Sequence, residues 1–189
     1  MEQSAFRATE SSRLRRNLRI RTAWLWTLGG NLHFAEWSRV RKITPDGIIT
    51  TVAGTTARAG SNNGCSPPAS PGCGPPPVGD GQAANSVQLF GPTRVAVDSA
   101  GNLYFVDGPR IREVTPDGII STVLGNGSYT GYHGFTGDGG PATSAPLWAP
   151  NGVTVDNAGN LYISEPVRIR KVTTDHQNHW GHAGTRTFR

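Results

Sequence analysis

Acidic side chains recur at corresponding places along this chain of 189 residues, and they are the first candidates for chemistry. They are Asp98 and Asp156, Asp107 and Glu165, and Asp138 within the sequence GDGG. Carboxylates that converge on one point can hold a divalent cation through their oxygens. Asp98 and Asp156 each stand three residues before a glycine, which is typical of an Asp that caps a tight turn. Asp138 keeps two interpretations, a cation ligand or an anchor for its own loop.

Four arginines also recur, at positions 110, 112, 168 and 170. A basic face built in this way could bind the phosphates of a nucleic acid. The net charge of +5 is concentrated elsewhere, however, because residues 1–21 hold six arginines against two glutamates. Glu113 directly follows the first arginine pair. We therefore interpret the arginines as a solvated strand edge and expect no nucleic-acid partner.

The other residue types that carry chemistry form no convincing set. The sequence has neither a Ser/His/Asp arrangement for nucleophilic catalysis nor a Gly-rich phosphate loop after a parallel strand. His176, His179 and His182 are spaced three apart, but they follow a point at which the repeat pattern breaks. We therefore predict no catalytic residue, no metal site and no cofactor. No apolar run approaches the roughly 20 residues that span a bilayer, so we expect no membrane partner.

The elements that would position these residues are short strands in repeated segments. The segments 29–54, 100–125 and 158–175 align without gaps. Within the second repeat unit, alternation and turn residues predict strands at 94–97, 102–106, 110–114 and 119–123. Ile111 and Val114 stand three apart, which predicts a β-bulge. Four antiparallel strands in a repeated unit form one blade of a propeller. The predicted fold is therefore all-β, a partial propeller of about two to three blades.

Two stretches give this pattern a family resemblance. PNGVTVDNAGNLYISEPVRIRKV and GFTGDGGPATSAPLWAPNGV resemble the NHL-repeat β-propellers, in particular a bacterial type with GFSGDGGPAT-like loops between blades. The resemblance covers residues 29–175 and implies blades like those of six-bladed propellers. Proteins of this family are often exported, although the chain contains no convincing signal peptide.

A Pro/Gly-rich loop at 57–81 interrupts the blades and is expected at the surface. Cys65 and Cys73 flank its central part. Two interpretations remain open, a small loop-closing disulfide in an oxidising compartment or two free thiols.

Residues 1–28 and 176–189 do not follow the repeat and are predicted to be irregular. Trp24 and Trp26 hold a clue to the first segment, because Trp has the single codon TGG. Read one base earlier, the codons for Trp24 to Thr27 can spell the Val-Ala-Val-Asp of residues 95–98. We predict that the first segment is translated out of frame; the alternative is a genuine extension. A displaced frame is also predicted for the tail.

Two functions compete at this stage. The first is a non-enzymatic propeller fragment that binds an unidentified protein or small ligand and self-associates through its open blade edges. The second is a hydrolase or lyase, because the gluconolactonase-like and streptogramin-lyase propellers resemble this fold. Such chemistry needs side chains from several blades to converge in one closed channel. We therefore favour the non-enzymatic function.

Overall fold

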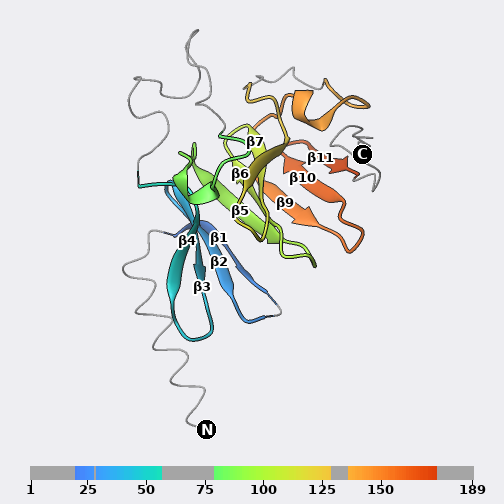
Figure 1. Ribbon diagram of the computed structural model, residues 1–189. Coiled ribbons are helices and arrows are strands. Elements are labelled where there is room, and N and C mark those ends of the chain that lie inside the picture. The colour runs from blue at the N-terminus through green and yellow to red at the C-terminus, as the bar shows by residue number, and fades with distance from the viewer. Residues whose placement is uncertain (1–19, 28, 57–78, 129–135, 174–189) are drawn as a thin grey trace.

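The computed structural model describes residues 20–27, 29–56, 79–128 and 136–173. In this part of the chain every sheet is antiparallel and each forms one blade (Figure 1). Blade 1 contains β1 (Ile20–Trp26), β2 (Leu32–Glu36), β3 (Arg39–Ile43) and β4 (Ile49–Ala53). Blade 2 contains β5 (Pro92–Val97), β6 (Leu103–Asp107), β7 (Arg110–Val114) and β8 (Ile120–Leu124). Blade 3 contains β9 (Gly152–Val155), β10 (Leu161–Glu165) and β11 (Arg168–Val172). The predicted all-β fold with two to three antiparallel blades is confirmed.

Local sequence explains the strand boundaries. In the turn between β7 and β8, the Gly118 N–H donates to the Thr115 carbonyl oxygen, and Gly118 has a φ of +85°. A glycine adopts this conformation without steric cost. The register of β7 against β8 shifts between Ile111 and Arg112, so the predicted bulge is confirmed. Blade 1 has the same shift between Val40 and Arg41.

The blades pack against one another in chain order, and β5 contacts both β1 and β9 (Figure 1). Two apolar cores result, which we name the first seam, between blades 1 and 2, and the second seam, between blades 2 and 3. Each loop between blades contributes one leucine to its seam, Leu89 to the first and Leu147 to the second. Both side chains are fully buried. These loops also carry the short 3-10 helices η1 (Ala84–Ser86) and η2 (Ala142–Ser144).

The two seams use the same repeat positions. On the side of the preceding blade, Ala35, Val40 and Ala53 of the first seam correspond to Val106, Ile111 and Leu124 of the second. On the side of the following blade, Leu103, Phe105 and Val114 correspond to Leu161, Ile163 and Val172. Alternation along its strands therefore gives blade 2 two apolar faces, one for each neighbour.

The predicted irregular segment 1–28 is wrong for residues 20–26, which form β1 and pair with β2. The physical reason is that β2 offers a free edge of backbone donors and acceptors, which an extended segment can satisfy whatever its side chains. Leu25 also packs against the first seam, at the position that Ala96 holds in the second. The displaced reading frame stays a prediction that the coding DNA can test.

Several other predictions concern residues outside the described part of the chain. They are the loop cysteines Cys65 and Cys73, the tail 176–189 with its histidines, and residues 1–19. Among the described residues, no helix has the length and apolar character needed to cross a membrane.

Candidate functional site

The aspartates at the first turn of blades 2 and 3 hold their turns closed. Asp98 Oδ1 accepts the Asn102 backbone N–H at 2.8 Å, and Oδ2 accepts the Asn102 amide at 2.8 Å and the Tyr104 hydroxyl at 3.1 Å. Asp156 makes the same three contacts with Asn160 and Tyr162. Hydrogen bonds from Asn160 lower the pKa of Asp156. The turn-cap interpretation of both aspartates is confirmed.

Asp107 and Glu165 anchor the loops that enter their blades. Asp107 Oδ1 accepts the backbone N–H groups of Phe90 and Gly91 at 2.7 and 2.9 Å. Glu165 Oε1 accepts the backbone N–H of Trp148 at 2.6 Å, and its other oxygen pairs with Arg168. Burial raises the pKa of Asp107, although these hydrogen bonds and Arg112 oppose the shift. Both carboxylates therefore have structural partners.

The recurring arginines are buried, so their interpretation as a solvated strand edge is wrong. Arg112 is 2% exposed and Arg170 is 1% exposed. Arg112 Nη2 lies 2.8 Å from Asp80 Oδ1, and its Nη1 lies 3.8 Å from Asp107 Oδ2. A buried guanidinium needs such partners because an unpaired charge is costly inside a protein. Alternation placed the arginines on the seam side of the strand, where the loop acids meet them.

Asp138 has the corresponding role in blade 3, and this resolves its two interpretations in favour of a loop anchor. Its Oδ1 lies 2.6 Å from Arg170 Nη2. Arg170 also donates to the carbonyl oxygens of Pro146 at 2.9 Å and Thr136 at 3.3 Å. We name this arrangement, an acid of the preceding loop paired with the buried arginine of the next blade, the loop clamp. It comprises Asp80 with Arg112 and Asp138 with Arg170.

Blade 1 departs from blades 2 and 3 at the polar positions that face its seam. In blade 2 the Tyr104 hydroxyl donates to Glu113 at 3.0 Å. In blade 3 the Lys171 ammonium lies 5.4 Å above the Tyr162 ring. In blade 1 the register pairs His33 with Lys42 at this place. Thr27 holds the position of the turn aspartate and exchanges hydrogen bonds with Asn31. The carboxylates that surround the tyrosine of blade 2 therefore have no counterpart here.

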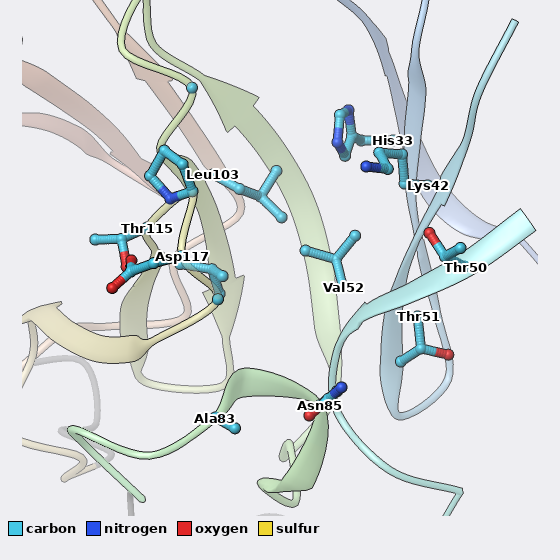
Figure 2. A pocket seen from close by; sticks show the side chains of 14 residues that line it. His33, Lys42, Thr50, Thr51, Val52, Ala83, Asn85, Leu103, Thr115 and Asp117 are labelled. Carbon is cyan, nitrogen blue, oxygen red and sulfur yellow. The ribbon is translucent and has the colours of Figure 1, made fainter.

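A cavity of about 350 Å³ lies beside His33 and Lys42, between blades 1 and 2. Blade 1 contributes His33, Lys42 and residues 50–52, and blade 2 contributes Leu103 and residues 114–118. Figure 2 shows the His33 ring beside the Lys42 side chain on one wall, with Leu103, Thr115 and Asp117 on the other. We name this space the first-seam crevice. Its volume is at the lower end of the range for small-molecule sites.

The polar groups of the crevice are unequally satisfied. His33 is 9% exposed, and its Nδ1 has no hydrogen-bond partner among the described residues. Burial and the nearby Lys42 charge lower the pKa of His33, so the imidazole is neutral at pH 7. Asp117 accepts a hydrogen bond from Thr115. The crevice therefore offers one cation and one unsatisfied imidazole nitrogen.

Sequence reasoning did not single out His33, Lys42 or Asp80. A signal was available for His33, because the aligned repeats carry Tyr at this position in blades 2 and 3. For Asp80 the signal was the GDG triplet that the two loops share at 79–81 and 137–139. Among the described residues, no group of three or more His, Cys, Asp and Glu side chains could hold a metal ion.

Comparison with known proteins gives a consistent family. The family model of the teneurin NHL domain matches residues 55–136. The chain is 35% identical over 112 residues to teneurin-3 of Danio rerio, an alignment that covers 58% of this chain and 4% of that protein. It is 30% identical over 142 residues to teneurin-4 of Mus musculus, which covers 74% of this chain and 5% of that protein. The chain thus spans only a small part of the length of these curated relatives.

A solved structure shows the same fold. A Bacteroides thetaiotaomicron protein of unknown function superposes with a TM-score of 0.53 at 24% identity, over 74% of this chain and 31% of that chain. The sequence relatives are animal proteins and this structural neighbour is bacterial, so the bacterial source that the resemblance implied stays a prediction. The repeats, the blades and both kinds of likeness agree, and the chain therefore belongs to the NHL-repeat β-propellers.

Proposed function

We propose that the chain is a non-enzymatic scaffold that binds other β-structured surfaces through its open blade faces. The observation that carries this proposal is the use of the recurring charged residues. Asp107, Arg112, Asp138, Glu165 and Arg170 all hold loops onto blades. These groups stabilise the architecture and are already paired. Large apolar side chains of blade 1, among them Trp24 and Trp26, are exposed instead.

The outer face of blade 1 is the surface that we expect to bind. Trp24 is 54% exposed, Trp26 is 68% exposed and Ile49 is 41% exposed. The corresponding residues of blade 2 are Val95, Val97 and Ile120, which pack into the first seam against blade 1. The same positions therefore face a neighbouring blade in one case and are largely exposed in the other. A second apolar β-surface, from another copy or from a partner protein, would bury these side chains.

Analytical ultracentrifugation of the purified chain tests this proposal. We expect concentration-dependent self-association that the double substitution Trp24→Ser/Trp26→Ser reduces. The matched control is Ile48→Ser, because Ile48 is 56% exposed and corresponds to Ile119, which stays 37% exposed in blade 2. An equal effect of both variants, or a parent chain that is monomeric with a sharp two-state melt, would contradict the proposal.

An activity assay addresses the competing function. The purified chain should show no turnover of lactone or ester substrates, with or without Ca²⁺. Turnover that a chelator abolishes and added metal restores would overturn the non-enzymatic proposal in favour of a hydrolase or lyase.

A further inference from the structure

The first-seam crevice contains a buried polar atom with no partner in the described part of the chain. His33 lines this space, and its buried Nδ1 accepts or donates no hydrogen bond within the described residues. Buried side-chain nitrogens are satisfied in the large majority of cases, by protein or by a bound molecule. In blade 2 the corresponding Tyr104 hydroxyl contacts two carboxylates, Asp98 and Glu113. In blade 2, carboxylates therefore lie beside the side chain at the repeat position that His33 occupies in blade 1.

The crevice wall that lacks the carboxylates of blade 2 carries a positive charge instead. Lys42 replaces Glu113 at the position across from the aromatic ring, and Thr27 replaces Asp98. Lys42 forms no ion pair within the described residues, whereas Arg39 and Arg41 of the same strand both pair with Glu36. Asp117 on the far wall is the other charged residue that lines the crevice. The wall near His33 is thus positive where the equivalent wall of blade 2 is negative.

The remaining walls restrict what could occupy the space. Val52, Leu103, Val114 and Pro116 are apolar, while Thr50 and Thr51 add hydroxyls beside Lys42. A small molecule with one anionic end and a short apolar body fits this combination. Inorganic phosphate lacks the apolar body, and a long chain exceeds a volume of about 350 Å³.

We propose that the first-seam crevice binds a small organic carboxylate, with the carboxylate between the Lys42 ammonium and His33 Nδ1 and the aliphatic part against Leu103. The neutral His33 tautomer that carries its proton on Nδ1 donates to one carboxylate oxygen, and Lys42 pairs with the other. Charge-assisted hydrogen bonds of this kind are about twice as strong as neutral ones. This binding is independent of the outer face of blade 1.

Butyrate is a suitable probe, and nuclear magnetic resonance of the His33 side chain is a suitable readout. We expect butyrate to bind with a dissociation constant on the order of 1 mM, as a ligand of six heavy atoms can. The bound anion favours the protonated imidazole, so saturating butyrate should raise the pKa of His33. Lys42 and Asp117 are the charged groups that line this cavity together with the His33 ring. Butyramide, which has the same shape without the charge, should bind far more weakly.

Two variants at one register position supply the matched control. Lys42→Gln should weaken butyrate binding about tenfold or more, because it removes a charged hydrogen-bond partner. Lys171→Gln removes the equivalent lysine of blade 3, beside Tyr162, and should leave the affinity within about twofold. His33→Tyr installs the residue of the other two blades and removes the Nδ1 donor, so butyrate should bind more weakly, and its spectrum also assigns the His33 signals.

Each outcome decides the proposal. Butyrate binding that depends on Lys42 but not on Lys171 supports it. Equal binding of butyrate and butyramide overturns it, as does equal affinity of the two lysine variants. No shift of the His33 signals at butyrate concentrations far above the expected dissociation constant also overturns it, because the parent chain is the protein tested in that arm.

Discussion

The two seams share their apolar half and differ in their polar half. Leucine, valine and isoleucine side chains occupy the same repeat positions in both, and Leu89 and Leu147 enter from corresponding loops. Beside this core, the second seam has Tyr104 and Glu113, whereas the first has His33 and Lys42. Packing therefore sets how one blade meets the next, since many apolar contacts must fit at once. The polar positions at the margin of the seam are freer to change, and they give each seam its own chemistry.

The largest expected effect is the loss of stability when the loop anchor of blade 2 is removed, compared with the loss when the anchor of blade 1 is removed. Asp107→Ala leaves the Phe90 and Gly91 N–H groups without their acceptor and removes one partner of the buried Arg112. We expect the free energy of unfolding to fall by about 3–5 kcal/mol. Glu36 holds the same repeat position, but its arginine partners are 16% and 26% exposed. Glu36→Ala should therefore cost about 1 kcal/mol or less. Chemical denaturation followed by fluorescence measures both losses. Equal losses would show that Asp107 and Glu36 stabilise their blades to the same extent.

The second prediction tests whether the apolar halves are equivalent. Leu89 and Leu147 are both fully buried, so Leu89→Ala and Leu147→Ala should each lower the free energy of unfolding by about 2–4 kcal/mol. The loss comes from the buried methyl groups and from the cavity that remains. The same denaturation experiment applies. A loss at one leucine more than about twice the loss at the other would mean that one seam relaxes around its cavity more easily.

The third prediction concerns the pH response of the second seam. Burial raises the pKa of Glu113, so the folded chain binds this proton more tightly than the unfolded chain does. Its contribution to stability is therefore lost as the pH rises from 4.5, the unfolded value, through the higher folded pKa. Glu113→Gln should flatten that part of the stability profile and change stability at pH 7 by about 1 kcal/mol or less. Thermal melts between about pH 4 and pH 8 measure this profile, and an unchanged slope in the variant would show that Glu113 titrates normally.

The smallest expected effect has the opposite sign and belongs to the first seam. Burial and Lys42 lower the pKa of His33, so the folded chain binds this proton less tightly than the unfolded chain. Stability from this group is present above 6.5, the unfolded value, and is lost as the pH falls through it toward the lower folded pKa. His33→Tyr should remove this acid-side loss and change stability at pH 7 by about 0.5 kcal/mol. A variant whose melting profile still declines below the unfolded imidazole value would assign the effect to another group.

Sequence periodicity was sufficient to predict the blades because each strand is encoded by alternation and turn residues that are adjacent in the sequence. The alternation of 94–97 and the TPDG turn before Ile119 predicted strands and a hairpin that the structure confirms. The loop clamp could not be predicted from neighbouring residues, because Asp80 and Arg112 are 32 residues apart and meet only after the blades have packed. β1 was missed for the opposite reason. Its pairing depends on the free backbone edge of β2 and not on the side chains of Trp24 or Trp26.

The crevice was missed because it depends on how blade 1 differs from the other blades and not on a motif within blade 1. His33 is an ordinary strand residue when blade 1 is considered by itself. It becomes informative only beside Tyr104 and Tyr162 and the carboxylates that surround the first of these. Repeats thus supply an internal control, in which the position that changes while its neighbours stay constant indicates a local function.

The loop clamp has a consequence for how proteins of this kind could grow. Each clamp joins a loop to the blade that follows it, Asp80 to Arg112 and Asp138 to Arg170. The unit that contains both partners is therefore a loop together with the next blade, and not a blade by itself. Duplication of the corresponding stretch of coding sequence would add a blade that already contains its own attachment to the previous one. A propeller assembled from such units could change its number of blades in a single genetic event, without first evolving a new interface.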